Sequence, residues 1–142
     1  MKNAKTNSPY TSQEPFEAER IHAAAIYCSD GRYGDQMDEF LHRALELPRY
    51  DRLAIPGGAA CLAPHIAAQR DAAALEKQLR FLIQIHELSR VVLIAHQECA
   101  FYKDVRLRNA TLQEYQFKDL AVAAARIASF SQNLKVEAYF AG

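Results

Sequence analysis

Arg90-Val-Val-Leu-Ile-Ala-His96 is the stretch of sequence that decides the fold. Five consecutive positions, from Val91 to Ala95, are apolar, and three of them are β-branched. An alternating pattern would indicate a strand with one face in water, whereas a continuous apolar run is typical of a strand covered on both faces. The stretch therefore predicts a central strand of a parallel sheet.

On both sides of this strand, short apolar runs alternate with segments of helical periodicity. From Asp71 to Ser89 apolar residues recur at spacings of three and four, which predicts a long helix lying on a sheet. Similar patterns predict strands over residues 22–28, 52–55 and 134–140, and helices over residues 36–47 and 111–130. Because parallel strands need crossover connections, this order predicts an α/β fold with a doubly wound, mostly parallel, four-stranded sheet flanked by helices.

The order of the strands would also determine where a ligand binds. If strand 52–55 lies on one side of strand 22–28 and strand 90–96 lies on the other, the strand order reverses between the last two. Doubly wound sheets bind ligands beyond the carboxyl ends of the strands at such a reversal. Cys28 and His96 end these two strands, so we expect them to lie in a functional site.

Composition narrows the classes of partner. The 142 residues include 17 Lys and Arg and 17 Asp and Glu, and a neutral chain lacks the positive field with which proteins bind nucleic acid. No apolar run approaches the roughly 20 residues that span a bilayer, and the polar start lacks the features of a secretory signal. Three cysteines, an odd number, fit a reducing compartment better than a disulfide framework. We expect a cytoplasmic protein that binds neither nucleic acid nor membrane.

The domain organisation is expected to be simple. Half of the residues are hydrophobic, so a chain of this length can bury a core without disulfides. Residues 1–20 are polar and contain two prolines, which predicts an arm or tail without a core of its own. Residues 21–142 are predicted to form one α/β domain.

Two short motifs leave the predicted neighbouring strands: Cys28-Ser-Asp30-Gly-Arg32 and His96-Gln-Glu-Cys99. Thiolate and imidazole suit tetrahedral Zn²⁺, so Cys28, His96 and Cys99 are the predicted metal ligands. Three protein ligands leave a fourth position open, as in catalytic zinc sites, and zinc there would lower the pKa of a bound water towards about 7. The alternative is that Cys28 is a core residue, Asp30 caps a turn and His96 merely ends its strand.

Asp30 and Arg32 are the predicted catalytic residues. Asp30 follows the first thiolate by two positions, close enough to accept a hydrogen bond from a zinc-bound water or to become the fourth ligand itself. Arg32 can hold the Asp30 carboxylate ionised and oriented, as residues supporting metal sites commonly do.

Together the two motifs resemble the paired zinc-binding motifs of the β-class carbonic anhydrases, and the strand order is similar from about Ala23 to Tyr139. The resemblance implies that Cys28, His96 and Cys99 bind zinc. It implies that Asp30 and Arg32 orient the zinc-bound hydroxide, or that Asp30 closes the zinc shell in a resting form. The implied activity is reversible hydration of carbon dioxide to bicarbonate, and the implied assembly is a homodimer or higher homo-oligomer with a β-carbonic-anhydrase-like core.

The resemblance is incomplete around the expected substrate pocket. Family members usually carry an Arg-Asn-Ala-Gly segment after the second strand, where this chain has Ala54-Ile-Pro-Gly57-Gly58-Ala59. Two alternatives therefore stay open: hydrolysis of a related small molecule such as carbonyl sulfide or carbon disulfide, and a zinc-binding module that has lost turnover. A third, a metal-free redox pair of Cys28 and Cys99, would leave His96 without a role.

The remaining polar features receive structural interpretations. Gly57-Gly58 predicts a tight turn, although a glycine pair could also let the backbone approach an anion. Cys61 lacks a spaced partner and is interpreted as a small buried hydrophobe. His65 and His86 are interpreted as surface histidines, with proton transfer to solvent as the alternative.

Overall fold

Four parallel strands form the centre of the molecule. The computed structural model describes residues 9–142, and its strands are β1 (Ala23–Cys28), β2 (Asp51–Ile55), β3 (Arg90–His96) and β4 (Lys135–Ala141). They pair in the order β2-β1-β3-β4, and every pair is parallel. The predicted doubly wound α/β sheet is confirmed, with the strand order reversing between β1 and β3.

The two middle strands are covered on both faces, as their sequences predict. All of β1 is buried, and Val91, Val92 and Leu93 of β3 are completely shielded from solvent. In the register of the two strands, Ile26 pairs with Leu93. Each large apolar side chain buried in this way stabilises the folded state by roughly 1.5–3 kcal/mol. The two strands therefore give the loops that follow them a fixed starting position.

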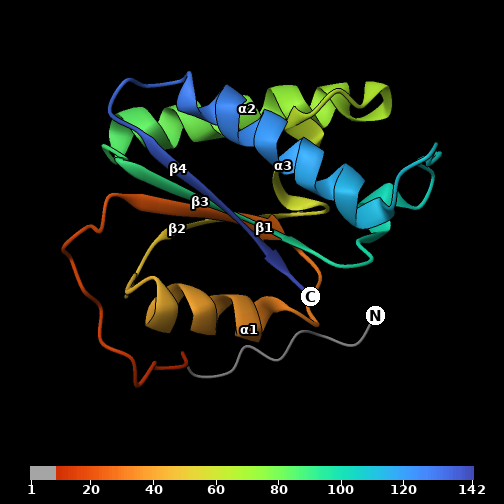
Figure 1. Ribbon diagram of the computed structural model, residues 1–142. Helices are drawn as coiled ribbons and strands as arrows, with labels where there is room; N and C mark the ends of the chain where they lie inside the picture. Colours follow the sequence, from red (N-terminus) through yellow and green to blue (C-terminus); the bar gives the residue numbers. More distant parts are fainter. Residues whose placement is uncertain (1–8) are drawn as a thin grey trace, which may run out of the picture.

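Helices form a layer on each face of the sheet (Figure 1). The long helices α2 (Gln69–Ile85) and α3 (Leu112–Ala128) lie together on one face, and the short helix α1 (Gly34–Glu39) lies on the other. This arrangement gives the molecule three layers, with the helices on either side of the parallel strands.

Each face of the sheet has its own core. On the face covered by the long helices, Ile26 packs in one cluster with Leu79 of α2 and Ile127 of α3. On the opposite face, the next residue of β1, Tyr27, packs in a cluster with Met37 of α1. Successive residues of β1 therefore enter different cores, which explains why the run is apolar at every position.

The predicted helix over residues 36–47 is wrong in its character and its end. After α1 the chain continues into a wider turn, η1 (Phe40–Ala44), in which the Leu45 amide donates to the Phe40 carbonyl at 3.1 Å. Pro48 disfavours a helical conformation of the residue before it, so regular helix cannot continue to the proline.

The two long helices differ from their predicted ranges at the ends. α2 stops at Ile85, short of Ser89, because Glu87 adopts a left-handed backbone with a φ of 51° that a helix cannot contain. α3 begins after Thr111, whose side chain accepts from the Glu114 amide while the Glu114 carboxylate accepts from the Thr111 amide. This capping box fixes the start of the helix.

Three short helical turns were not predicted, and all of them lie in the connections that leave the carboxyl ends of β2 and β3. They are η2 (Gly58–Leu62), η3 (Ile66–Ala68) and η4 (Ala100–Tyr102). Turns of this length carry no periodic signal in the sequence, so pattern analysis cannot detect them.

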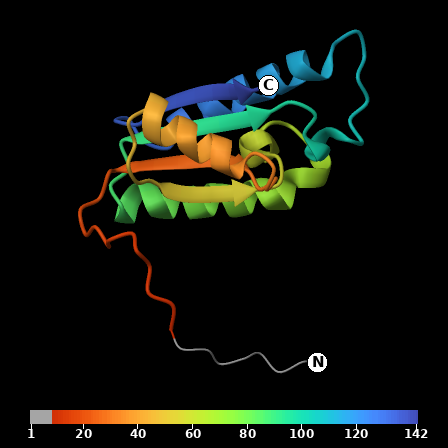
Figure 2. The same ribbon diagram turned by 90° about the horizontal axis from the view of Figure 1, so that it is seen from below.

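The segment before β1 has no helix or strand from residue 9 to residue 20, and its side chains are exposed. Figure 2 shows it leaving the start of β1 and running away from the sheet. Residues 1–8 of the predicted arm lie outside the described residues, and the division into an arm and one domain stays a prediction. No helix of the described chain combines the length and the apolar character needed to cross a bilayer.

Candidate metal centre

The first residues of the site come from the ends of the two middle strands. Cys28 is the last residue of β1 and His96 is the last residue of β3. Because β1 and β3 are parallel neighbours, their ends meet at the same edge of the sheet. Cys99 follows on the loop after β3, immediately before η4. The reversal of strand order thus brings the three residues together.

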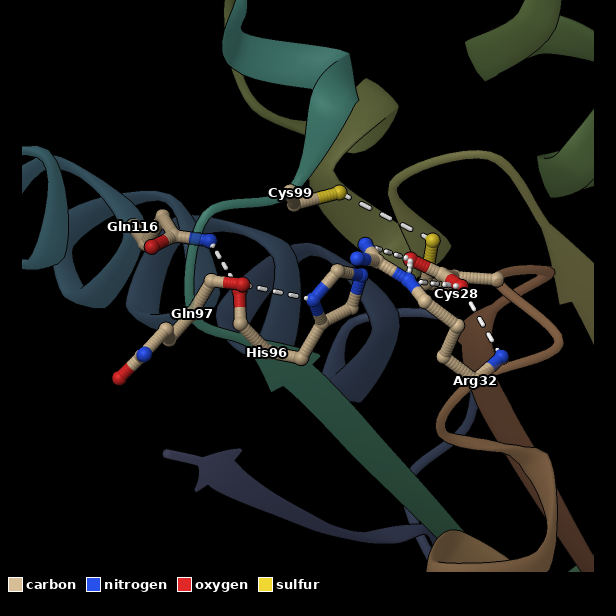
Figure 3. A network of polar contacts seen from close by, with 7 residues as sticks. Cys28, Arg32, His96, Gln97, Cys99 and Gln116 are labelled. Atoms are coloured by element: carbon tan, nitrogen blue, oxygen red, sulfur yellow. Dashed lines mark hydrogen bonds and ion pairs between the residues drawn. The ribbon is translucent and has the colours of Figure 1, made fainter.

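The donor atoms of these three residues form a compact cluster (Figure 3). The sulfur atoms of Cys28 and Cys99 lie 3.8 Å apart, and all three donor atoms lie within 4.8 Å of one another. Two Zn–S bonds of about 2.3 Å at a tetrahedral angle hold their sulfurs roughly 3.8 Å apart. All three side chains are buried. The spacing of the two sulfurs therefore matches a tetrahedral divalent metal, and the imidazole of His96 lies close by.

The imidazole of His96 is oriented so that it could bind a metal. Its Nδ1–H donates to the carbonyl of Gln97 at 2.9 Å, which leaves a lone pair on Nε2. Nε2 is buried and has no hydrogen-bond partner within residues 9–142. Tyr33 supports the other side of the ring, with centroids 4.3 Å apart in a stacked arrangement. A buried acceptor without a partner is costly, and a metal ion would satisfy it.

The two thiols change each other's pKa through the hydrogen bond that joins them. A hydrogen bond from Cys99 lowers the pKa of Cys28, and this effect, with the backbone amide of Gly57, outweighs the opposing effect of burial. The same hydrogen bond and burial raise the pKa of Cys99. A divalent cation would stabilise both groups as thiolates and release their protons.

Asp30 and Arg32 form a close ion pair beside this cluster. Arg32 donates from Nη2 to Oδ2 of Asp30 at 2.7 Å, from Nε to both carboxylate oxygens, and from its amide to Oδ1 at 3.0 Å. These hydrogen bonds lower the pKa of Asp30 to about 2. The carboxylate is therefore ionised and held in one orientation near neutral pH.

Comparison with known proteins agrees with this geometry. A family model described as "Putative carbonic anhydrase" matches residues 18–142. The chain belongs to this carbonic anhydrase family. No curated protein and no solved structure gave a match. The resemblance drawn from the two motifs is confirmed, and the match extends beyond them to almost all of the described chain.

In this member of the carbonic anhydrase family, Gly57-Gly58 does more than form the predicted turn. Both residues have left-handed backbones, with φ values of 77° and 57°. A Cβ on Gly58 would lie 3.2 Å from the backbone of Tyr27, so the glycine allows the loop to press against the end of β1. The backbone amide of Gly57 also helps to lower the pKa of the Cys28 thiol. The two adjacent glycines after β2 were the signal in the sequence for a close backbone contact. Only the order of the strands shows that the contact is with the end of β1.

Gln116 of α3 is a site residue that sequence analysis missed. Its Nε2 donates to the backbone carbonyl of His96 at 2.7 Å, and its side chain is buried (Figure 3). The signal was a polar residue on the buried stripe of α3, which also contains Asp119, Ala123 and Ile127. A polar residue on the buried stripe of an amphipathic helix is a candidate for a specific contact.

The other cysteine and two histidines have structural environments of their own. Cys61 is buried, as predicted, and burial raises the pKa of its thiol to about 11. The interpretation of His65 as a surface residue is wrong: its side chain is 12% exposed and bonds to Asp119 at 2.6 Å. His86 bonds to Asp51 at 2.5 Å at the opposite end of the sheet, where β2 begins, so it is far along the strands from the metal cluster.

Proposed function

We propose that this chain is a zinc-dependent carbonic anhydrase that catalyses the reversible hydration of carbon dioxide to bicarbonate. The observation that carries the proposal is the buried cluster of Cys28, His96 and Cys99, in which Nε2 of His96 has no partner among the described residues. Membership of the carbonic anhydrase family supports the same reaction.

The donor set supports zinc in particular. Two thiolates and one imidazole bind tetrahedral Zn²⁺ in preference to the harder cations Mg²⁺ and Ca²⁺. With three protein ligands, zinc supplies the Lewis acidity that makes water a nucleophile near neutral pH. The two thiolates and the neutral imidazole together balance the charge of a divalent cation, so the buried site carries little net charge.

In this proposal Asp30 accepts a hydrogen bond from the attacking water and directs it towards the carbon of the substrate. Arg32 keeps the carboxylate ionised, which preserves its role as an acceptor throughout the physiological pH range. Both carboxylate oxygens already accept from Arg32. The carboxylate keeps a further lone pair with which it can accept from the water.

The surroundings of the two thiols favour a small, uncharged substrate. Tyr102 and Ala60 are buried against Cys28 and Cys99, and the partly buried residues of the same cluster are Phe101, Val105, Leu112 and Tyr115. Carbon dioxide is linear and apolar, so an apolar wall accepts it without desolvating a charge.

Hydrolysis of carbonyl sulfide or carbon disulfide is a second candidate, and one specific feature favours it. The loop from Ile55 to Ala59 has only apolar side chains and glycines. Such a loop offers no side-chain donor to the oxygens of bicarbonate, and sulfur needs fewer hydrogen bonds than oxygen does. The nucleophile and its orienting groups would be unchanged.

We further propose a cytoplasmic protein that acts as a homodimer or higher homo-oligomer. The three cysteines are all free, which supports a reducing compartment. β2 and β4 are edge strands of the sheet, and a second copy of the chain would cover an edge that is otherwise open to unwanted pairing.

Stopped-flow measurement of carbon dioxide hydration tests the proposal, with zinc-loaded protein compared with protein stripped by a chelator. We expect hydration that requires zinc and is lost in Cys28→Ser. Zinc-loaded protein that hydrolyses carbonyl sulfide but does not hydrate carbon dioxide would favour the second candidate. Protein that holds one zinc and turns over neither substrate would be a metal-binding module, and protein that takes up no zinc would overturn the proposal.

A further inference from the structure

The buried stripe of α3 changes from apolar to polar along the helix. Ala123 and Ile127 are completely buried, and the preceding positions on the same stripe are Gln116 and Asp119, which are 1% and 6% exposed. Within residues 9–142, these two side chains and His96 are the only buried ones that are polar or charged. Polar groups are costly to bury, so their concentration beside one metal ligand calls for a functional reason.

Gln116 holds the end of the strand that carries His96. The carbonyl of His96 accepts from Gln116 at 2.7 Å, and the amide of the same peptide group, that of Gln97, donates to Ala141 of β4 at 2.9 Å. Both polar ends of this peptide are therefore fixed. The carbonyl of Gln97, in the next peptide group, accepts from Nδ1 of His96, so the imidazole is oriented by a peptide that directly follows the one that Gln116 holds.

Asp119 holds the turn that carries Cys99. The amide of Tyr102 donates to the carbonyl of Cys99 at 3.1 Å, which closes the turn η4. The hydroxyl of Tyr102 donates to Oδ2 of Asp119 at 2.7 Å. The same oxygen accepts from Nε2 of His65 at 2.6 Å. One carboxylate oxygen thus links the Cys99 turn to the connection between η2 and η3, which follows the glycine pair.

We propose that Gln116 and Asp119 are positioning residues of the metal centre. Through them, α3 fixes the position of His96 relative to that of Cys99. Gln116 acts on His96 through the peptide that follows it, and Asp119 acts on Cys99 through Tyr102. The two residues are three positions apart on one helix, so the spacing between the two supports is fixed by rigid secondary structure. The inference rests on the proposed function only in requiring that the cluster binds a metal.

A purely structural role would also explain two satisfied polar groups, and it makes a different prediction. Groups that only stabilise the fold should change the stability of the metal-free protein and leave the coordination geometry alone. Groups that orient ligands should change metal affinity and the spectrum of the bound metal, because residues supporting a metal site typically contribute about 10–100-fold to affinity.

The experiment compares Gln116→Met, Asp119→Asn and Tyr102→Phe with the unsubstituted protein. Zinc affinity is measured by competition with a chromophoric chelator, and the ligand field is measured from the absorption bands of the Co²⁺ form. Urea unfolding of the metal-free proteins reports stability separately. Matched controls are Gln84→Met, at an exposed position on α2, and Tyr115→Phe, in the same aromatic cluster as Tyr102.

We expect Gln116→Met and Asp119→Asn to weaken zinc binding by about tenfold or more and to shift the Co²⁺ bands. Tyr102→Phe, which removes one hydroxyl, should weaken binding several-fold and keeps the test valid if Asp119→Asn does not fold. The control variants should have the zinc affinity and the Co²⁺ absorption bands of the unsubstituted protein. Folded variants with unchanged affinity and spectrum would overturn this inference alone. An unsubstituted protein that binds neither metal would overturn the proposed function as well.

Discussion

The backbone of Gly57 lies directly against the ring of Phe101, and a Cβ built on Gly57 would be 2.6 Å from Cγ of that ring. No real Cβ contact is that short, so the loop after β2 and the loop after β3 can meet only through a glycine. Gly57 also has a φ of 77°, which side chains rarely adopt. This contact joins the two loops that surround the cysteines.

Gly57→Ala should therefore lower the free energy of unfolding by roughly 1–3 kcal/mol, from overpacking and backbone strain together. It should also weaken zinc binding, because Phe101, against which Gly57 packs, lies in the turn that follows Cys99. Urea unfolding and metal titration measure the two effects. Gly34→Ala is the control: its added Cβ meets nothing within 4 Å, so stability should be unchanged or higher. Equal results for the two variants would contradict the packing argument.

The role proposed for Asp30 leads to a second prediction. Asp30→Asn keeps the size of the side chain but removes the charge that pairs with Arg32. We expect turnover to fall by about 10²–10⁴-fold, the usual contribution of a positioned acid or base, with zinc content unchanged. Hydration rate per bound zinc is the measurement, and Asp35→Asn, at an exposed position at the start of α1, is the control. Undiminished turnover in Asp30→Asn would rule out the orienting role.

The clustering of Cys28, His96 and Cys99 could be predicted because the signals are local. Continuous apolar runs end at Cys28 and at His96, and their parallel pairing follows from the alternation of strands and helices. Once the two strands are neighbours, the chemistry of the donor atoms indicates a metal. The central position of β3 was predictable for the same reason, since only a strand covered on both faces needs such a run.

The support of the site could not be predicted, because it depends on tertiary packing. Gln116 and Asp119 contact His96 and Tyr102 only because α3 crosses that end of the sheet. No pattern in the sequence around them indicates these contacts. His65 was misinterpreted for the same reason, since its partner Asp119 is 54 residues away. The widened turn after α1 was missed because its apolar spacing still matches a regular helix.

A third prediction concerns the pH dependence of stability. Arg90 of β3 and Glu137 of β4 form a two-point ion pair across adjacent strands, at 2.5 and 3.2 Å. Hydrogen bonds from Arg90 lower the pKa of Glu137 below its ordinary value. The stabilisation is therefore fully present above the unfolded pKa of about 4.3 and is lost as the pH falls through the lower folded value.

Glu137→Gln should lower the free energy of unfolding by roughly 1–2 kcal/mol near pH 7, since one partner of a charged hydrogen bond is removed. The difference from the unsubstituted protein should shrink as the pH falls below about 4. Urea unfolding with chelator present isolates this effect from metal loss. Glu39→Gln breaks a longer, exposed pair with Arg43 (3.6 Å) and should have little effect at any pH. A difference that persists undiminished at pH 3 would count against the ion pair as its source.

The last prediction separates the two cysteines that we propose as metal ligands from Cys61. Zinc that binds only the folded protein should stabilise it by about 2.7 kcal/mol at a free concentration one hundred times the dissociation constant. Removing zinc should therefore lower the melting temperature of the unsubstituted protein. Cys99→Ser should abolish this difference. Cys61→Ala should preserve it, because that thiol lies in the apolar core and is not part of the metal cluster.

Calorimetry with and without chelator measures the difference in each protein, and metal analysis measures the zinc that each retains. The two variants remove the same chemical group from buried positions, so a general sensitivity to loss of a thiol would lower the melting temperature of both in the same way. Only metal ligation predicts that the zinc-dependent part of the stability disappears in Cys99→Ser and survives in Cys61→Ala. Loss of zinc from Cys61→Ala would show that the third thiol belongs to the site, and the three-ligand arrangement would then be wrong.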